Sequence, residues 1–450
     1  MFLPHTDSER SEMLKTIGVS SIDELFQDVP EKVRYPTLNL PPALTEMEVA
    51  AQLQQMALAN ETTQDLACFL GAGAYNHYIP ATVDHILRRN EFYTAYTPYQ
   101  PEVSQGTLQA IFEYQSLMCA LTGMEVSNAS HYDGATATAE AGIMAYHTFR
   151  GKRTRFVLSP GVHPQYRQVF RTYMSGYEGL EILGDETEGD PMDYLERLEG
   201  LINSNTALVV VQYPDFFGQI HDLASLAEKV HQAGGLFAVV VNPIALGLLK
   251  PPGEFGADIV VGDGQPLGIP LSFGGPYLGI FTTRKEYVRR IAGRLVGETV
   301  DVQGRRGYVL TLTAREQHIR REKATSNICT NQGLMALAAT VYLALVGKEG
   351  LRQVAELCYH KAHYAADRIA QIRGYHVLNQ RPFFHEFVVK CPKPVAEINN
   401  YLLDYGILGG YDLGQDYPAL KDHMLIAVTE MNSREEIETL AEYLEEFAHD

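Results

Sequence analysis

The chain of 450 residues has no tryptophan and only five cysteines. The cysteines, none of which forms a CxxC pair, are Cys68, Cys119, Cys329, Cys358 and Cys391. Their odd number and irregular spacing argue against a disulfide framework or a zinc site, so we expect reduced thiols and no metal site. The sequence also lacks the GxxxxGK[ST], GxSxG and HExxH motifs, which argues against the nucleotide-binding, hydrolase and zinc-protease classes that these motifs define.

Membrane and nucleic-acid partners are not expected either. The first residues, Met1–His5, show no basic region followed by an apolar run, so no secretory leader and a cytoplasmic location are expected. The apolar run Leu334–Val346 covers roughly 13 residues, fewer than the roughly 20 that span a bilayer, and predicts a core helix. The formal net charge of -19 gives a surface that repels phosphate backbones and anionic lipid.

Residues 1–60 have the pattern of an arm with little core of its own. Ser21–Phe26 predicts a short capped helix, and Thr45–Ala59 predicts a second helix. Between them, prolines indicate an extended crossing at Pro30, Pro36, Pro41 and Pro42. Because such an arm cannot bury its apolar side chains against itself, we expect it to wrap a neighbouring chain.

Residues 61–330 alternate helices with apolar strands. Periodicity predicts helices at 104–123, 135–146, 164–174 and 223–233. Ser104 can cap the first of these helices, and Gly123 can end it. Short apolar runs predict strands at 155–158, 206–212, 236–241 and 259–261. Apolar strands separated by helices imply a parallel sheet covered on both faces, and therefore an α/β domain.

Residues 331–450 predict a smaller α+β domain. Helices are expected at 332–346, 351–373, 394–405 and 433–447, and strands at 384–389 and 424–428. An arm, a large domain with a parallel-type sheet and a smaller C-terminal lobe form the architecture of fold-type I, aspartate aminotransferase-like enzymes that use pyridoxal 5'-phosphate (PLP). Other two-lobed α/β enzymes would give a similar pattern.

Three segments concentrate groups that can do chemistry. Ala74–Pro80 and Phe92–Gly106 are dense in hydroxyls, amides and prolines just before a core helix, and can present hydrogen-bond donors from a rigid frame or pack at a subunit contact. Ser127–Ala141 places small residues at a helix start, where backbone N–H groups can hold an anion or simply pack tightly. The third, Gly262–Pro276, is glycine-rich and follows a buried strand.

These segments resemble the glycine cleavage system P-protein family. Phe92–Gly106 matches the family signature YTAYTPYQPE-SQG, and the resemblance implies that it borders the glycine pocket. The residues expected there are Tyr93, Tyr96, Tyr99, Gln100, Glu102 and Ser104. Gly134, Ala135 and Thr136 fall where related enzymes hold the PLP phosphate, although the family usually has leucine and glutamate where this chain has His131 and Gly134.

In the catalytic half of P-proteins, the third segment reads approximately HKTFCIPHGGGGP, and its lysine forms the Schiff base with PLP. Aligning the two Ile-Pro pairs puts Gln265 on that lysine, and an amide cannot form an imine. The same alignment puts Val240 where a carboxylate should face the pyridine nitrogen. Together the two substitutions predict that this chain has lost its own PLP site.

Several other residues bear on whether this chain binds PLP or another anion. Lys250 and Lys323 are the nearest candidates for a replacement lysine, with a solvated side chain the simpler interpretation of Lys250. His163 lies where such enzymes stack a ring on PLP, and without PLP we expect a structural role. The five arginines in the stretch 305–321 form either a solvated face or a basic site for carboxylate or phosphate, and the second is slightly favoured.

The resemblance implies a subunit role. The complete P-protein decarboxylates glycine, releases CO2 and passes the aminomethyl group to the lipoyl arm of H-protein. This chain would be subunit 1, paired with a subunit 2 that carries the lysine and PLP, two copies of each. Two alternatives stay open: an autonomous PLP-dependent lyase or transferase that uses a misaligned lysine, and a non-enzymatic scaffold that kept only the fold.

Overall fold

A computed structural model describes residues 4–94, 96–186, 190–379 and 381–449 of the chain. The chain divides into two compact units, Met1–Glu61 and Thr62–Asp450. Each unit is described by itself. The predicted division at residues 60 and 330 into an arm and two domains stays a prediction.

The N-terminal unit has short helices and no core. Its elements are α1 (Asp7–Ile17), η1 (Asp23–Phe26), η2 (Glu31–Val33) and α2 (Glu46–Leu58). The prediction of α2 is confirmed, and Thr45 caps it through a capping box with Glu48. Helix α1 was not predicted, because its polar sequence carries no apolar stripe. No described residue of this unit is buried.

The second unit is built on a seven-stranded sheet in the order β2-β8-β7-β6-β5-β3-β4. The strands are β2 (Val126–Ser127), β3 (Arg155–Leu158), β4 (Glu181–Leu183), β5 (Thr206–Tyr213), β6 (Leu236–Val241), β7 (Ile259–Asp263) and β8 (Gly279–Thr283). The predicted strands β3, β5, β6 and β7 run parallel, as expected, and β4, which was not predicted, runs parallel to β3. Strand β8, however, is antiparallel to both β7 and β2. The sheet is therefore mixed rather than all-parallel.

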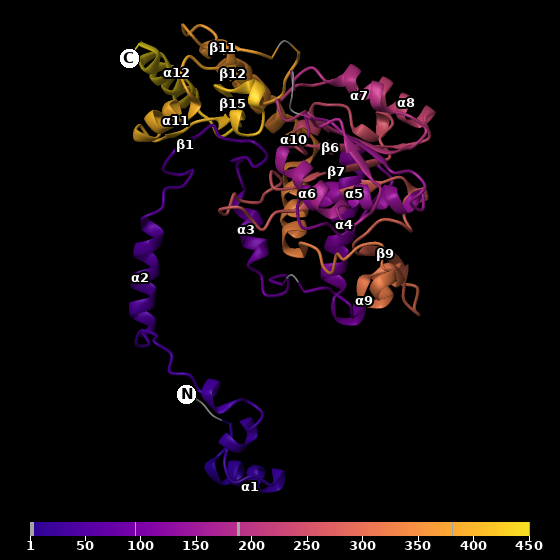
Figure 1. Cartoon of the computed structure of the whole chain (residues 1–450), viewed down its shortest axis with the longest axis vertical. Helices are drawn as coiled ribbons and strands as arrows, with labels where there is room; N and C mark the ends of the chain where they lie inside the picture. The colour runs from indigo at the N-terminus through magenta and orange to yellow at the C-terminus, as the bar shows by residue number, and fades with distance from the viewer. Residues whose placement is uncertain (1–3, 95, 187–189, 380, 450) are drawn as a thin grey trace. The chain divides into compact units, whose positions relative to one another are not determined.

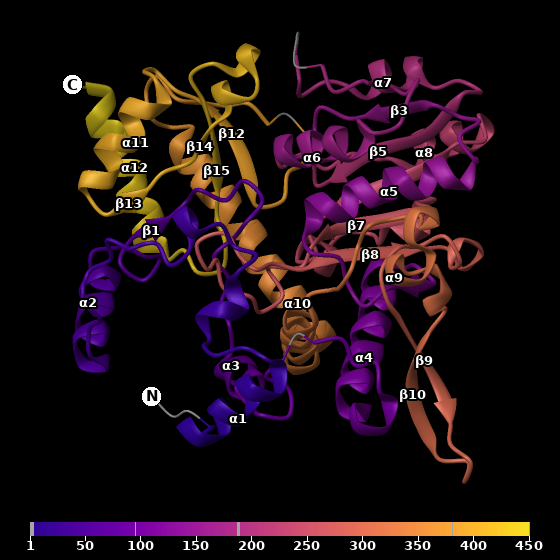
Figure 2. The same ribbon diagram turned by 60° about the horizontal axis from the view of Figure 1, so that its bottom comes forward.

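Helices cover both faces of this sheet (Figure 2). They are α5 (Gly134–Thr148), α6 (Pro164–Met174), α7 (Leu195–Leu201) and α8 (Ala224–Gln232). One apolar cluster includes alternate residues of β5 and β6 with α5 and α6, and another includes the intervening residues with α7 and α8. The two clusters confirm that the central strands are buried on both faces, which is why their sequences read as continuous apolar runs.

Two long helices pack beside the sheet. They are α4 (Gln105–Thr122) and α10 (Gly333–Ile369), which lie together with α3 (Ala81–Leu87) in a third apolar cluster. Gly123 ends α4 in the left-handed conformation as predicted, but the Ser104 side chain makes no capping hydrogen bond. Two helices were predicted at 332–346 and 351–373. Both lie within α10, which is interrupted at Gly347, where the backbone is not helical (φ 60°).

In the described part of the chain, α10 is long and apolar enough to cross a membrane by length and composition alone. Most of its alanines, together with Tyr342, Leu343, Leu351 and Cys358, lie in buried clusters, so we interpret it as a core helix.

The C-terminal strands and helices gather at one end of this unit (Figure 1). A four-stranded sheet has the order β11 (His376–Val377), β12 (Glu386–Lys390), β15 (His423–Ala427) and β14 (Tyr411–Asp412). Helices α11 (Val395–Asp404) and α12 (Arg434–His449) pack on it with the end of α10. A small parallel pair, β1 (Ala67–Cys68) and β13 (Ile407–Leu408), joins residues near the start of this unit to its C-terminal part.

The remaining elements are short. An antiparallel hairpin is formed by β9 (Leu295–Val300) and β10 (Arg306–Thr311) and projects from the body of the unit in Figure 2. The others are η3 (Pro101–Val103), η4 (Ala245–Gly247), η5 (Pro252–Phe255), η6 (Lys285–Tyr287), η7 (Thr313–Arg315), α9 (Gln317–Arg320), η8 (Arg321–Lys323), η9 (Leu413–Gln415) and η10 (Pro418–Leu420).

A glycine at position 218 lets the large sheet meet the C-terminal strands. Gly218 has φ 79°, and a Cβ there would overlap the backbone carbonyl of Glu386. Gly304 has a similar φ of 76° but open space around it. We expect Gly304→Ala to cost about 1 kcal/mol for the left-handed backbone. Gly218→Ala should cost about 1–3 kcal/mol more for the overlap. Urea denaturation of both variants tests this, and equal losses would contradict it.

Candidate functional site

The Gln265 side chain is buried in a closed hydrogen-bond arrangement. Its amide oxygen accepts from the backbone N–H of Tyr75 at 2.9 Å, and its amide nitrogen donates to the carbonyl oxygen of Tyr75 at 2.9 Å. The same nitrogen donates to the carbonyl of Ile269 at 2.8 Å. Gln265 is 1% exposed. The amide therefore joins two segments that are 190 residues apart in the sequence. Its role is structural, whereas a lysine amine at this position would form the Schiff base.

The predicted anion cradle at the start of α5 is filled by protein carboxylates. The N–H of Gly134 donates to Asp263 at 2.9 Å, and the N–H of Thr136 donates to Asp133 at 2.8 Å. The other oxygen of Asp263 accepts from the N–H of Gln265 at 2.9 Å. Burial raises the pKa of Asp263 to about 7, against the lowering effect of these hydrogen bonds. Two of the three N–H groups expected to hold a phosphate, those of Gly134 and Thr136, thus already bind carboxylates of this chain, and no such bond is seen for Ala135 among the described residues.

A small cavity remains between these residues. Its lining includes His163, Tyr166, Val240 and Asp263, and its volume is ≈ 30 Å³, room for about one water molecule. Among the described residues, no lysine lines it. The His163 ring stacks on Tyr166 at 4.8 Å, and its Nε2 lies 2.8 Å from the carbonyl oxygen of Ala72. Burial lowers the pKa of His163 to about 4, so the ring is neutral and structural.

The tyrosine segment lies at the surface. Tyr93 and Tyr96 are 68% and 80% exposed, and Gln100 and Glu102 are exposed as well. Residue 95 of this motif lies outside the described residues. Tyr99 is fixed differently, since its hydroxyl accepts from the guanidinium of Arg294 at 2.6 Å and that cation lies 5.4 Å from its ring. The structure brings these residues to an open surface next to half-buried Ser104 and does not enclose them in a pocket.

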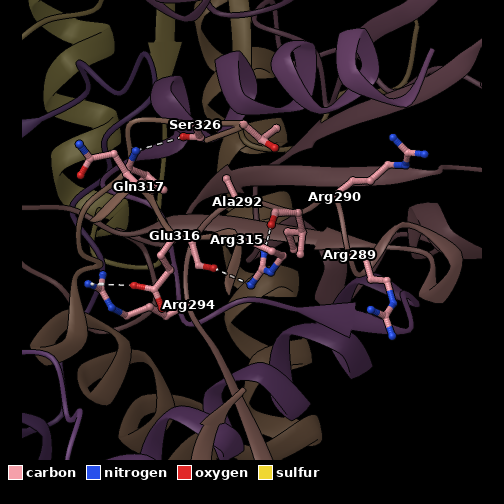
Figure 3. A pocket seen from close by; sticks show the side chains of 12 residues that line it. Arg289, Arg290, Ala292, Arg294, Arg315, Glu316, Gln317 and Ser326 are labelled. Atoms are coloured by element: carbon pink, nitrogen blue, oxygen red, sulfur yellow. Dashed lines mark hydrogen bonds and ion pairs between the residues drawn. The ribbon is translucent and has the colours of Figure 1, made fainter. Parts of the chain in front are cut away.

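The arginines of 305–321 are mostly used within the chain. Arg305 pairs with Asp301, Arg306 with Glu298, and Arg320 donates to a backbone carbonyl. Arg315 donates to the carbonyls of Ile291 and Gly293. Three further arginines, Arg289, Arg290 and Arg294, precede this stretch. Figure 3 shows Arg294 paired with Glu316, whereas the side chains of Arg289 and Arg290 point away from Glu316. These pairings favour a structural role over the basic anion site that the sequence slightly favoured.

The sequence interpretation missed a cavity of ≈ 480 Å³ beside α5. Glu140 and three tyrosines line it with the segment Ala324–Ile328, which carries Ser326. The hydroxyl of Ser326 donates to Glu140 at 2.5 Å, and burial raises the pKa of that carboxyl to about 7. The tyrosines are Tyr132, Tyr173 and Tyr177. A buried carboxylate in an apolar helix run, as in Ala137–Ala145, was the available signal.

A second missed residue is Glu386 in β12. Its carboxylate accepts from the N–H of Ala72 and from the hydroxyl of Tyr75, both at 2.8 Å. Burial raises its pKa to about 7, although these bonds oppose the shift. Tyr75 is therefore held at its backbone by Gln265 and at its hydroxyl by Glu386. No local sequence pattern links positions separated by 311 residues.

Comparison with known proteins identifies the family of this chain. The sequence profile of the family described as "Glycine cleavage system P-protein" matches residues 1–444. The chain belongs to the glycine cleavage system P-protein family. It is 57% identical to "Probable glycine dehydrogenase (decarboxylating) subunit 1" of Thermomicrobium roseum, over 99% of each chain.

Solved structures agree with this family assignment. A crystal structure of glycine decarboxylase (P-protein) of the glycine cleavage system, in inhibitor-bound form, has a TM-score of 0.89 with 43% identity and 99% coverage of both chains. The glutamate decarboxylase of Lactobacillus brevis has a TM-score of 0.69 at 13% identity, with 95% and 97% coverage, and shares the fold alone. The predicted fold, that of fold-type I PLP enzymes, is confirmed.

The residues at the position equivalent to a PLP site do not fit PLP. Gln265 offers a hydrogen-bonded amide in place of an amine, and Val240 offers no charge to a pyridinium nitrogen. Asp263 accepts from the N–H of Gly134, one of the expected phosphate donors, and its carboxylate would repel a phosphate.

The raised pKa of Asp263 predicts a pH-dependent stability. The carboxyl has a reference pKa of 3.8 and a folded pKa of about 7, so the folded chain holds the proton more tightly than the unfolded chain. Ionisation from about pH 4 to pH 7 therefore destabilises the native chain. We expect Asp263→Asn, which cannot ionise, to gain unfolding free energy relative to the natural chain across this range, with no further gain above it. Urea titrations from pH 4 to 8 measure the difference, and a constant difference would contradict the account.

Proposed function

We propose that this chain is the non-lysine subunit of a two-subunit glycine decarboxylase. A second P-protein subunit carries the lysine and the PLP, and the two chains assemble as two copies of each. Together they decarboxylate glycine, release CO2 and pass the aminomethyl group to the lipoyl arm of H-protein. The likeness to subunit 1 relatives over 99% of the chain supports the pairing with a distinct subunit 2.

The observation that carries the proposal is the closure around Gln265. The amide is satisfied by three hydrogen bonds at a position where an amine would be needed. Lys250 and Lys323, the alternative lysines, are both exposed and neither lines the small cavity. This disfavours an autonomous PLP enzyme and supports a division of labour in which the reactive nitrogen belongs to the partner.

The surface of the chain supports an intimate partner. In the N-terminal unit, exposed apolar side chains include Leu38, Leu40, Met47, Leu53, Met56 and Leu58. Exposed apolar groups in such number and with no core beneath them indicate a surface that another protein covers. We propose that subunit 2 is that protein.

The open tyrosine surface supports a role at the partner's reaction site. Tyr93 and Tyr96 present hydroxyls and rings to solvent, whereas Arg294 holds Tyr99 in one place. A rigid frame that presents hydroxyls at an open surface can complete a site on a second chain and exclude water from it. We propose that Tyr93, Tyr96, Tyr99 and Gln100 border the glycine of the assembled enzyme.

Reconstitution tests the shared reaction. Alone, the chain should give no exchange of label between bicarbonate and the glycine carboxyl group, because it lacks the amine. Mixed with the lysine-bearing subunit, it should raise the exchange rate at least about tenfold above that subunit alone, as expected when positioning groups are supplied. Full activity of the lysine-bearing subunit by itself would reduce this chain to a scaffold. Exchange by this chain alone would make it an autonomous enzyme.

Charged substitutions in α2 test whether the N-terminal arm contacts subunit 2. Leu53→Asp with Met56→Asp should weaken association with subunit 2 by at least about 100-fold, since burying two such side chains contributes about 3 kcal/mol or more. The side chains are 60% and 55% exposed, so the fold of the free chain should not change. Gln52→Asp with Gln55→Asp adds the same charge at the same spacing and serves as the control. Sedimentation measures both affinities, and equal losses would contradict a specific apolar contact.

A further inference from the structure

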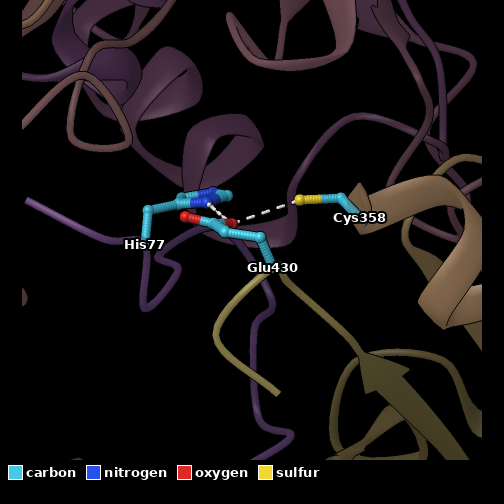
Figure 4. Close-up of side chains that lie close together, drawn as sticks. All are labelled: His77, Cys358 and Glu430. Carbon is cyan, nitrogen blue, oxygen red and sulfur yellow. Dashed lines mark hydrogen bonds and ion pairs between the residues drawn. The ribbon is translucent and has the colours of Figure 1, made fainter. Parts of the chain in front are cut away.

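Three side chains that can bind a metal meet in the interior of the second unit. His77 lies in the loop before α3, Cys358 in α10, and Glu430 in the turn after β15. Their ligand atoms all lie within 4.8 Å of one another. Figure 4 shows the imidazole and the thiol directed at the same carboxylate. Segments distant in the sequence thus bring an imidazole, a sulfur and a carboxylate to one point.

The contacts within this cluster are short. His77 Nδ1 lies 2.7 Å from a carboxylate oxygen of Glu430, and the Cys358 thiol donates to that same oxygen at 3.3 Å. The other oxygen accepts from the N–H of Tyr78 at 2.8 Å. Lys361 donates to the carbonyl oxygens of Glu430 and Asn432 and so fixes the turn that carries the carboxylate. The turn that carries Glu430 is therefore held in place by hydrogen bonds.

The three side chains of this cluster are almost completely removed from solvent. The side chains of His77 and Glu430 are 2% and 9% exposed, and Cys358 is fully buried. Although burial opposes ionisation, the bonds from His77 and Tyr78 lower the pKa of Glu430 to about 2. Burial and the nearby carboxylate raise the pKa of Cys358 well above its usual range. His77 Nε2 has no hydrogen-bond partner among the described residues.

We propose that His77, Cys358 and Glu430 form a binding site for a zinc-type divalent cation. Imidazole, thiolate and carboxylate are the donors that zinc takes in proteins, and three protein ligands leave a fourth tetrahedral position for water. The sulfur favours a borderline-soft ion over magnesium or calcium. A thiolate and a carboxylate together balance the charge of the ion.

Binding exchanges protons for the ion. The Cys358 S–H bond breaks as the sulfur–metal bond forms, and that proton leaves to solvent. The proton on His77 Nδ1 is replaced by the ion, and the ring coordinates as the tautomer protonated at Nε2. The bound ion would fasten the loop that carries Tyr75, helix α10 and the turn after β15.

The groups that face the cluster fit this role. The His385 ring stacks against that of His77 at 6.3 Å, and burial together with the charge of His77 lowers its pKa. Lys361 is the nearest cation, and its ammonium is bound to two carbonyl oxygens. The ammonium of Lys361 is therefore already bonded within the turn that carries Glu430.

Metal titration of the full chain tests the site. The chain is freed of metal with a chelator under a phosphine reductant and titrated with Zn2+ and then with Co2+. One ion per chain should bind, and Co2+ should give the visible bands of a tetrahedral site with a thiolate charge-transfer band. Cys358→Ser should abolish the charge-transfer band and weaken Zn2+ binding by at least about 100-fold, since loss of a direct ligand exceeds typical outer-shell effects.

Two further variants complete the test. Cys391→Ser removes another buried thiol, one outside this cluster, and should leave both signals unchanged. His77→Gln should keep the charge-transfer band and weaken Zn2+ at least about tenfold, which decides the matter if Cys358→Ser does not fold. No retained ion, or equal binding by the Cys358 and Cys391 variants, would overturn the proposal and leave the cluster as a hydrogen-bond junction.

Discussion

The buried amide of Gln265 constrains much of the structure around it. By accepting from and donating to the backbone of Tyr75, it holds the loop Ala74–Pro80 against the segment after β7. Glu386 holds the hydroxyl of the same tyrosine from the C-terminal sheet. These hydrogen bonds join the segment after β7 and the C-terminal sheet to the same loop. In the function proposed above, this packing takes the place of a reactive centre.

This closure changes where the chain can contribute to chemistry. The N–H of Gly134 at the start of α5 holds Asp263, whereas the exposed tyrosines and the N-terminal unit, which has no described buried residue, present surfaces to other molecules. Both are costly for an isolated protein, because exposed apolar groups favour association. A partner that covers them would gain hydroxyl-bearing side chains at its own site.

Much of the fold could be predicted from sequence, because buried strands and amphipathic helices leave strong periodic signals; β3, β6 and α6 have the predicted bounds. Strand β8 was not predicted, and the sequence carries no signal for its antiparallel direction. The substitution at Gln265 was evident from the motif, but its hydrogen bonds to Tyr75 required the structure. Asp263 could have been found as an acid ending a buried strand. His77, Cys358 and Glu430 could not, because their spacing follows no local motif.

The most direct test of the central claim is to locate the cofactor in the assembled complex. Borohydride reduction fixes PLP to the lysine that holds it, and peptide mass spectrometry identifies that lysine. The account predicts that every pyridoxyl-lysine peptide derives from the partner subunit. A pyridoxyl group on any lysine of this chain, Lys250 and Lys323 included, would contradict it.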